Sequence, residues 1–236
     1  MTSAAIMQPT YLPWIGYFSL IDQVDIFVFL DKVQFDKRSW QQRNRIKTAQ
    51  GELFLTVPVQ TKGKRFQKIC EVQLDPTQHY HAKHLKVIEN NYSKAQYFLE
   101  YWPDMSEALN RGYHYLADLN ISLIQWFVKK LGIKTTFIRS SDLKSEGTKV
   151  NLLVGICHEI EADQYVSPLG SKVYIGENNI FQPEKIDLFY QNYTHPEYTQ
   201  LYKKFIPYLS MLDLLMNEGS KSLEIMRTGQ NELVSC

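Results

Sequence analysis

Residues 26–30 form a continuous apolar run, Ile-Phe-Val-Phe-Leu, between two acids, Asp25 and Asp31. The run is too short to be a helix of its own, and its lack of polar alternation is typical of a strand buried on both faces. A second apolar run lies at residues 3–7, and residues 15–21 between the two carry apolar side chains at helical spacing. The three segments together predict a βαβ unit, in which a helix joins two parallel strands.

Strand-like and helical segments continue to alternate along the rest of the chain. Residues 53–59 predict a strand that has an edge or an end at Pro58, because proline cannot donate to a strand ladder. Across the basic turn 62–68, this strand and residues 69–74 predict a hairpin. The other predicted elements are two helical stretches within 78–130 divided at Pro103 and ended by Gly132, a strand at 135–139, a helix at about 149–160, a strand at 164–167, an irregular stretch from 186, and a helix at 211–217 between Ser210 and Gly219.

This alternation predicts an α/β fold with a mainly parallel open sheet, of the nucleotidyltransferase-like, Rossmann-like type. With 44% hydrophobic and 22% charged residues, the 236-residue chain has enough apolar side chains for a large core. No internal repeat or linker divides it. We therefore expect a single α/β domain over residues 1–236, with residues 78–131 as a helical insertion.

The charges are nearly balanced, with 26 Lys and Arg against 25 Asp and Glu and a net charge of +1. No overall field attracts a nucleic-acid backbone or an anionic membrane, so we expect neither nucleic-acid binding nor membrane insertion. No stretch approaches the roughly 20 apolar residues of a spanning helix, and the first residues lack a signal-peptide pattern. We expect a cytoplasmic protein in which Cys70, Cys157 and Cys236 are reduced thiols.

Aromatic residues make up 13% of the chain, which favours a cleft with planar walls for a ring-bearing ligand. The first candidate segment, residues 8–18, joins the first strand to the first helix, and ligands of open α/β sheets bind beyond the carboxyl ends of strands. Its candidate binding residues are Gln8, Tyr11, Trp14, Gly16 and Tyr17. The alternative is a proline-rich turn whose Trp and Tyr fill the core.

Part of this segment is similar to a degraded HxGH signature of nucleotidyltransferase-like folds, in which a glycine lets the nucleotide approach the backbone. Trp14 and Tyr17 stand where the two histidines would be. Those histidines stabilise charge on phosphates, so their replacement argues against nucleotidyl transfer in its usual form. Aromatic side chains at these positions can still stack on a base or a sugar.

The polar segment at residues 31–46 is the second candidate, because it follows a buried strand and is rich in Arg, Gln and Asn. Arginine can hold a diphosphate through paired hydrogen bonds, amide side chains can bind the edge of a pyrimidine, and an indole can stack on it. The candidate binding residues are Gln34, Lys37, Arg38, Trp40, Arg43, Asn44 and Arg45. The alternative is a solvated charged loop. In the loop 167–172, Ser171 and Lys172 are weaker candidates for holding a phosphate or carboxylate.

Three residues are candidates for proton transfer, namely His84, His195 and Asp31. Histidine titrates near neutral pH, which suits a base that frees a sugar amine from its ammonium form. The alternative for His84 is an ordinary helix-surface histidine, and for His195, which precedes Pro196, a structural hydrogen bond. The HxHxxH run at 79–84 is not predicted to bind metal, because its histidines do not share one helical face.

Several segments match the motifs of one known family: Ile6-Met-Gln-Pro-Thr-Tyr-Leu-Pro-Trp-Ile-Gly-Tyr-Phe18, Val33-Gln-Phe-Asp-Lys-Arg-Ser-Trp40 with Arg43-Asn-Arg-Ile46, Thr56-Val-Pro-Val59, His195-Pro-Glu-Tyr198 and Leu209-Ser-Met-Leu-Asp-Leu-Leu-Met-Asn217. On these residues the chain resembles the WbqC-like family over nearly its whole length. The resemblance implies a bacterial cytoplasmic protein of O-antigen (lipopolysaccharide) and other surface-polysaccharide pathways. In that context, unusual sugars are made as nucleotide diphosphates, commonly dTDP-linked, and are modified on an amino group.

Within that context the sequence favours an enzyme that forms an amide on a nucleotide-diphosphate amino sugar, using an amino acid such as glycine or another small acyl donor. Such an enzyme is an N-acyl or aminoacyl transferase, or an ATP-dependent amide ligase by analogy with similar folds. ATP and Mg²⁺ stay open as cofactors. The alternatives are a non-catalytic sugar-nucleotide binding or scaffold protein and a degenerate nucleotidyltransferase. The expected partner is a small-molecule nucleotide sugar, and a homodimer stays open.

Overall fold

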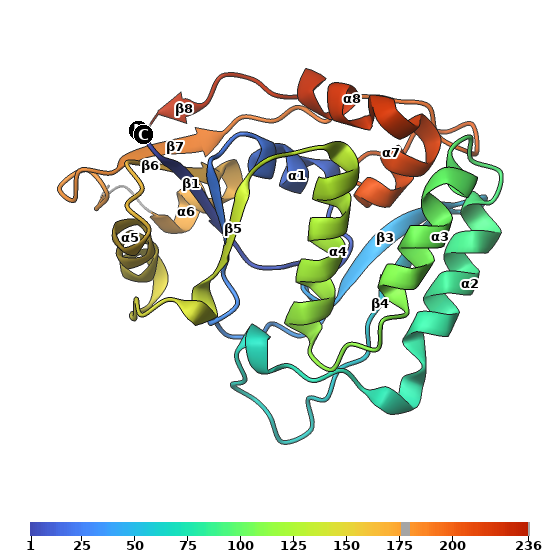
Figure 1. Ribbon diagram of the computed structural model, residues 1–236, viewed down its shortest axis with the longest axis horizontal. Helices are drawn as coiled ribbons and strands as arrows, with labels where there is room; N and C mark the ends of the chain where they lie inside the picture. Colours follow the sequence, from blue (N-terminus) through green and yellow to red (C-terminus); the bar gives the residue numbers. More distant parts are fainter. Residues whose placement is uncertain (176–179, 236) are drawn as a thin grey trace.

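The computed structural model describes residues 1–175 and 180–235 (Figure 1). Its centre is a six-stranded sheet in the order β5-β2-β1-β6-β7-β8, parallel except for β8, which is antiparallel to β7. The strands are β1 (Ser3–Met7), β2 (Ile26–Phe29), β5 (Thr136–Arg139), β6 (Gln164–Pro168), β7 (Asp187–Gln191) and β8 (Val234–Ser235). Numbered along the chain, the parallel strands lie in the order 3-2-1-4-5, which is that of a doubly wound fold. The predicted α/β class with a mainly parallel open sheet is confirmed.

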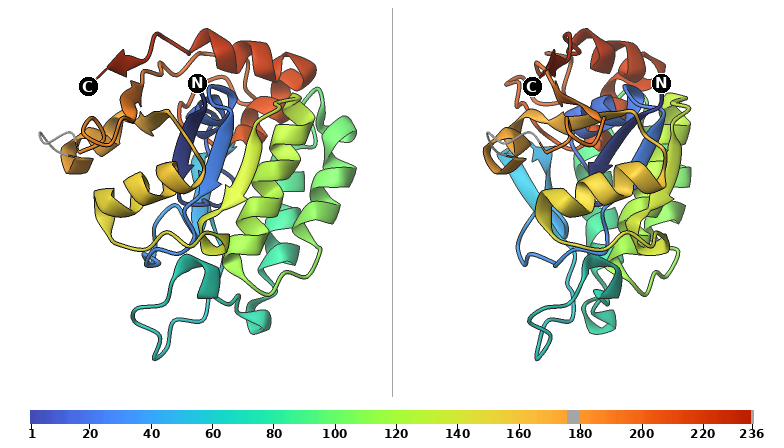
Figure 2. Two further views of the ribbon diagram at one scale, coloured as in Figure 1. Left: turned by 60° about the vertical axis from the view of Figure 1, so that its left-hand side comes forward. Right: turned by 90° about the vertical axis from the view of Figure 1, so that its left-hand side faces the viewer.

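Helices cover both faces of this sheet (Figures 1 and 2). The helices are α1 (Ile15–Asp22), α2 (Tyr80–Tyr92), α3 (Phe98–Leu109), α4 (Leu116–Leu131), α5 (Lys149–Glu159), α6 (Lys172–Ile175), α7 (Met211–Glu218) and α8 (Ser222–Thr228). Phe27 and Phe29 of β2 share an apolar cluster with Phe18 of α1 and with α4, whereas Val28 shares another with Leu152 of α5. Successive side chains of β2 therefore enter opposite cores, which explains its unbroken apolar sequence.

Beside the sheet, β3 (Arg43–Thr48) and β4 (Gly51–Thr56) form a two-stranded antiparallel hairpin. β3 belongs to the segment that the sequence indicates as polar, yet one of its faces is buried throughout. Asn44, Ile46 and Thr48 are buried on that face, whereas on the other face Arg43 and Arg45 are partly exposed and Lys47 is buried. The polar residues on both faces conceal the strand from a hydropathy pattern.

The hairpin predicted between residues 53–59 and 69–74 is wrong, because β4 pairs with β3 instead. The first residues of the second segment form a 3₁₀ turn, Ile69–Glu71. Among the described residues, strand pairing between the two segments is limited to an isolated bridge between Val59 and Leu74. Loop hydrogen bonds, rather than a ladder, therefore hold the basic turn.

Pro103 lies inside α3, so the predicted division of the helical region at this residue is wrong. The region breaks instead at residues 93–97 and 110–115. Proline removes the hydrogen bond to the residue four positions earlier, Leu99, whose side chain is exposed, so solvent can reach that turn. The stretch from residue 186, predicted to be irregular, includes β7, because pairing with β6 supplies a stability that its mixed composition does not indicate.

Two predicted helix ends are confirmed. Gly132 ends α4 in the left-handed conformation, with φ of 75°. Ser210 caps α7, and its Oγ accepts a hydrogen bond from the first turn at 3.2 Å. The Ser210 N–H donates to the Arg45 carbonyl at 3.1 Å, which joins the start of α7 to the hairpin. Within residues 1–175 and 180–235, no helix has both the length and the apolar character needed to cross a bilayer.

Candidate functional site

The carboxyl ends of β1 and β6 are neighbours at the point where the strand order reverses, and ligands of open α/β sheets bind at such points. A cleft of about 760 Å³ opens there, which we call the switch-point cleft. It is lined by Ile6, Met7, Gln8, Thr10, Leu30, Val33, Ser39, Trp40, Gln41, Lys149, Leu152, Leu153 and Pro168. The cleft thus lies between the sheet, the loop after β2, the segment before β3 and the start of α5.

A smaller pocket of about 320 Å³, the aromatic pocket, adjoins the switch-point cleft. It is lined by Met7, Thr10, Trp14, Tyr17, Trp40, Asn44, Arg45 and Tyr208. Both volumes are lined by Met7, Thr10 and Trp40, which we call the shared wall. One ligand can therefore extend along these residues from one volume into the other. The aromatic rings give the smaller pocket the planar walls that the composition indicates.

Trp40 forms the shared wall and is 49% exposed. Its carbonyl accepts a hydrogen bond from the Tyr11 N–H at 3.0 Å, which ties the segment before β3 to the loop after β1. Its ring stacks on Phe54 with 6.1 Å between centroids, and the guanidinium carbon of Arg45 lies 5.8 Å from the indole centre. An exposed indole beside an arginine is suited to stacking against a flat ligand.

Asn120 of α4 holds the two loops that form the shared wall. Its Nδ2 donates to the Pro9 carbonyl at 3.1 Å and to the Gln41 carbonyl at 2.7 Å, and its side chain is fully buried. Gln41 Nε2 also donates to Gln8 Oε1 at 2.8 Å. Asn120 is not among the residues predicted from the sequence. The signal that could have found it is an amide within the apolar stripe of an amphipathic helix, because a buried amide needs partners.

Gly16 allows the Trp14 ring to lie against α1, since a Cβ at this position would be 2.1 Å from that ring. Gly16→Ala is therefore expected to displace the Trp14 wall and to destabilise the protein by roughly 1–3 kcal/mol, the range for overpacking. Tryptophan fluorescence and thermal unfolding measure the two effects. Gly170→Ala is the control, because nothing lies within 4 Å of a Cβ there. An unchanged spectrum and melting temperature in Gly16→Ala would contradict this account of Trp14.

Arg45 supplies the positive charge of the aromatic pocket. Its Nη1 pairs with Glu52 across the hairpin at 2.7 Å, and its buried Nε has no hydrogen-bond partner in the part of the chain that the structure describes. The side chain of its neighbour Asn44 is engaged within the protein, because Nδ2 donates a hydrogen bond to the Leu12 carbonyl at 2.9 Å. Because Arg45 lines the pocket, its guanidinium places a positive charge where an anionic or carbonyl acceptor of a ligand can contact it.

The predicted binding residues divide between the clefts and their surroundings. Those that line a cleft are Gln8, Trp14, Tyr17, Trp40, Asn44 and Arg45. Gln34, Lys37 and Arg38 are exposed on the segment before β3, and Arg43 lies over the Phe54 ring at 5.0 Å. Of the three arginines, Arg45 lines the aromatic pocket, whereas Arg43 contacts the Phe54 ring that stacks on Trp40.

The loop after β6 borders the switch-point cleft through Pro168. The Ser171 hydroxyl is hydrogen-bonded to the Ser167 hydroxyl at 2.6 Å and donates to the Pro168 carbonyl at 2.7 Å. The Lys172 ammonium lies 5.7 Å from the centre of the Tyr190 ring. Ser171 and Lys172 thus shape the edge of the cleft and are not among its lining residues.

Asp31 is fully buried at the carboxyl end of β2, where donors surround its carboxylate. Arg139 Nε donates at 2.9 Å, the Ser140 hydroxyl at 3.0 Å, and the Ser141 N–H and hydroxyl at 2.9 Å each. The carboxylate therefore links the ends of β2 and β5, and it is not among the lining residues of either cleft. A catalytic role for Asp31 stays a prediction.

His84 is buried on the inner side of α2 and is not among the residues that line either cleft. Its Nδ1 and the Tyr11 hydroxyl form a hydrogen bond of 2.8 Å. Burial lowers the pKa of His84 to about 4, well below the neutral range expected for a surface histidine. Tyr11, also a predicted binding residue, is fully buried as the partner of His84. A role for His84 as base stays a prediction.

His195 lies beside the aromatic pocket. Its ring is parallel to Trp14 within 11°, with 6.3 Å between centroids, and has an edge contact with Tyr208 at 5.0 Å. Its Nδ1 is hydrogen-bonded to the Pro196 carbonyl at 2.9 Å, and its buried Nε2 has no partner among the described residues. Burial lowers the pKa of His195. Of the three proton-transfer candidates, His195 is the one in contact with pocket residues.

Two lining residues that are not among the candidate binding residues named from the sequence have left-handed backbones. Lys149, the first residue of α5, has φ of 52°, and Tyr208 has φ of 59°. Side chains with a Cβ are strained in this conformation, and such strain concentrates at functional sites. The sequence signal that could have indicated Lys149 is a glycine, Gly147, two residues before a lysine at the start of a predicted helix. In the structure this glycine has φ of 128°.

Tyr208 belongs to residues 192–209, a segment that a buried polar network holds in place. Lys47 Nζ donates to Gln200 Oε1 at 2.8 Å. The Tyr198 hydroxyl donates to Asp213 Oδ2 at 2.9 Å. Burial raises the pKa of Asp213 to about 6 and lowers the pKa of Lys47. The network fixes the backbone that carries one wall of the aromatic pocket.

The described residues that line the two clefts include no carboxylate and no histidine. In residues 1–175 and 180–235, no group of three or more His, Cys, Asp or Glu side chains is arranged to hold a metal ion. The clefts are thus equipped for stacking, hydrogen bonding and cationic contacts.

Comparison with known proteins gives one family. The model of the WbqC-like protein family matches residues 8–225, a range that contains the loop after β1, the hairpin and the start of α5. The chain is 38% identical over 229 residues to the uncharacterized protein Rv1507c of Mycobacterium tuberculosis (strain ATCC 25618 / H37Rv), an alignment that covers 96% of this chain and 98% of that protein. No solved structure gives a significant match, so the nucleotidyltransferase-like assignment stays a prediction.

Proposed function

The chain belongs to the WbqC-like protein family, and we propose that it is an enzyme that forms an amide on the amino group of a nucleotide-diphosphate sugar. The substrate is proposed to be a dTDP-linked amino sugar used in O-antigen or another surface polysaccharide. The reaction joins the sugar nitrogen to the carbonyl carbon of an activated acyl donor, releases the activating group and forms an amide.

The observation that carries this proposal is the aromatic pocket, which adjoins a larger cleft at the switch point of the sheet. Trp40 and Trp14 line it with aromatic rings for a base or a sugar, and the Arg45 guanidinium supplies a positive charge for a phosphate or carbonyl oxygen. A ligand in two parts, a ring and an extended group, suits two volumes that share a wall.

The proton of the sugar ammonium must leave before its nitrogen can attack. Of the candidates named from the sequence, His195 has the best geometric support for this step, because it stacks on Trp14 and touches Tyr208, two residues of the aromatic pocket. Its Nε2 is buried without a hydrogen-bond partner among the described residues, so it can accept the proton once the ligand gains access to it. His84 and Asp31 are engaged in buried hydrogen bonds instead.

One observation favours a second function, that of a non-catalytic sugar-nucleotide binding or scaffold protein. Among the described lining residues, neither cleft contains the carboxylate or histidine that general acid–base chemistry uses. A protein that only binds its ligand needs no such group, so the two functions are separated by turnover rather than by affinity.

A thermal-shift panel with dTDP, UDP, CMP and ATP tests the binding part of the proposal. A ligand present at 100 times its dissociation constant adds about 2.7 kcal/mol of stability, so the correct nucleotide raises the melting temperature clearly. Incubation with a dTDP-amino sugar and activated acyl donors, with and without ATP and Mg²⁺, then tests amide formation by mass spectrometry. Binding without product supports the scaffold function, and no shift with any nucleotide rejects both.

Arg45→Ala is expected to weaken nucleotide-diphosphate binding by about 1.5–3 kcal/mol, the range for hydrogen bonds to charged groups. The matched control is Arg38→Ala, which removes an equal charge from an exposed position outside both clefts. Isothermal titration calorimetry with the best nucleotide diphosphate measures both affinities. If Arg38→Ala, Arg43→Ala and Arg45→Ala all bind like the wild type, arginine does not hold the phosphates.

A further inference from the structure

The switch-point cleft differs in chemistry from the aromatic pocket. One side of its wall is aliphatic and comes from β1, the loop after β2 and α5, through Ile6, Met7, Leu30, Val33, Leu152 and Leu153, whereas Gln8, Thr10, Ser39 and Gln41 are polar and uncharged. Aliphatic walls do not bind phosphate, ribose or glycine, whereas they bind a hydrocarbon chain by removing it from water. The cleft, at about 760 Å³, also has more than twice the volume of the aromatic pocket, at about 320 Å³.

Among the described residues of this cleft, Lys149 carries the charge. It is the first residue of α5, and its left-handed backbone, with φ of 52°, fixes how it enters the wall. The preceding residue, Thr148, makes no side-chain cap hydrogen bond, so the positive end of α5 adds to the lysine charge. An aliphatic wall with one cationic position is complementary to a chain that ends in an anion.

We propose that the switch-point cleft binds the acyl donor of the reaction, and that this donor carries an aliphatic chain of several carbons activated as an acyl phosphate or acyl adenylate. The inference rests on the proposed function and names its donor class, a fatty-acyl type rather than glycine. The chain lies against the aliphatic wall, and the phosphoryl anion lies beside Lys149. The sugar nitrogen bonds to the acyl carbon, the bond from that carbon to the phosphate oxygen breaks, and the phosphate leaves with the electron pair and takes up the amine proton.

The direct test measures binding of n-butyl, n-hexyl and n-octyl phosphate to the wild-type protein, by calorimetry and by tryptophan fluorescence. Burying one methylene strengthens binding about fourfold, so the dissociation constant is expected to fall about fourfold for each added methylene. The n-alkanols of the same lengths separate the contribution of the alkyl chain from that of the phosphate. They are expected to bind more weakly than the phosphates but to show the same change in dissociation constant for each added methylene. A dissociation constant that does not depend on chain length overturns the inference.

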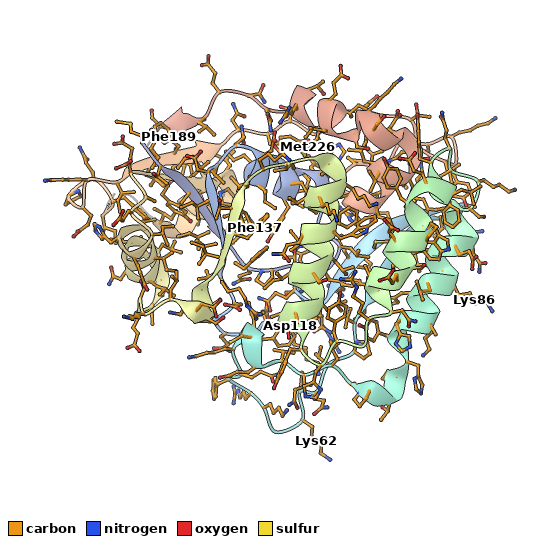
Figure 3. The ribbon with its side chains drawn as sticks, in the orientation of Figure 1. Lys62, Lys86, Asp118, Phe137, Phe189 and Met226 are labelled. Atoms are coloured by element: carbon orange, nitrogen blue, oxygen red, sulfur yellow. The ribbon has the colours of Figure 1, made fainter. Side chains whose placement is uncertain are left out.

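Two variants locate the ligand. Lys149→Gln is expected to weaken every alkyl phosphate about tenfold or more without changing the slope, whereas Lys86→Gln, at an exposed position of α2 (Figure 3), has no effect. Val33→Trp fills part of the cleft, so the affinity for alkyl phosphates is expected to stop rising at a shorter alkyl chain than in the wild type. Leu99→Trp, at an exposed position, is its control. Melting temperatures show that each variant is folded. Full octyl phosphate affinity in both cleft variants would place the chain elsewhere and overturn the inference.

The same titrations keep this inference separate from the function on which it rests. Nucleotide diphosphates are measured alongside, and Arg45→Ala reports their binding in the aromatic pocket. Nucleotide binding together with a flat chain-length series rejects the fatty-acyl donor and leaves the sugar-nucleotide function standing. A steep chain-length series without any nucleotide binding rejects the sugar-nucleotide function.

Discussion

Asp31→Ala is expected to lower the free energy of unfolding by about 3–5 kcal/mol, the cost of removing one partner from a buried ionic site. The Asp31 carboxylate is fully buried and accepts hydrogen bonds from Arg139, Ser140 and Ser141. Its removal leaves these donors without an acceptor at the ends of β2 and β5. Urea unfolding, followed by circular dichroism, measures the loss.

Asp118→Ala is the matched control, because Asp118 also accepts from Arg139, at 2.7 Å, but is 41% exposed at the start of α4 (Figure 3). A partly exposed pair contributes about 1 kcal/mol or less, so this variant is expected to lose far less stability. If the two variants are equally stable and Asp31→Ala alone abolishes turnover, Asp31 is catalytic and this structural account of its carboxylate is wrong.

Much of the fold can be predicted from the sequence wherever one segment determines its own environment. The apolar run of β2 indicates burial on both faces whatever its neighbours are, and Gly132 and Ser210 mark helix ends through local geometry. β3 and β7 are different, because each is stabilised as a strand by pairing with a neighbour, β3 with β4 and β7 with β6. Their polar and mixed sequences contain no local signal strong enough to outweigh the alternatives.

The part of the candidate site that can be predicted from the sequence consists of residues that directly follow or precede a strand. The segment after β1 and the segment before β3 do meet, as expected for motifs at one edge of a sheet, and Trp14 and Trp40 both line the aromatic pocket. The contributions of Lys149 and Tyr208 depend on backbone conformation and on distant elements. Asn120 acts through contacts from a helix more than 70 residues along the chain from the loops it holds.

The stability of the protein is expected to fall by about 3 kcal/mol through His84 alone as the pH is lowered from 7 to 4. Burial holds the pKa of His84 at about 4 in the folded protein, whereas the unfolded chain has the ordinary value of 6.5. Between these values the unfolded state binds a proton that the folded state does not, so protonation favours unfolding. Stability from this group is complete above pH 6.5 and is lost progressively as the pH falls toward 4.

His84→Gln isolates this contribution, because glutamine can hydrogen-bond to the Tyr11 hydroxyl but does not titrate in this range. The difference in unfolding free energy between wild type and His84→Gln is expected to shrink as the pH falls from 7 to 4. His114→Gln, at an exposed position away from His84, is the control and is expected to follow the wild type. If His84 is instead the base for the sugar amine, His84→Gln lowers kcat by roughly 10²–10⁴ at unchanged stability and nucleotide affinity. The hydrogen bond of 2.8 Å to a fully buried Tyr11 favours the first result, since the ring has no lining position in either cleft. A pH-independent stability difference together with the kcat loss would reverse this assignment and make His84, rather than His195, the residue that accepts the proton.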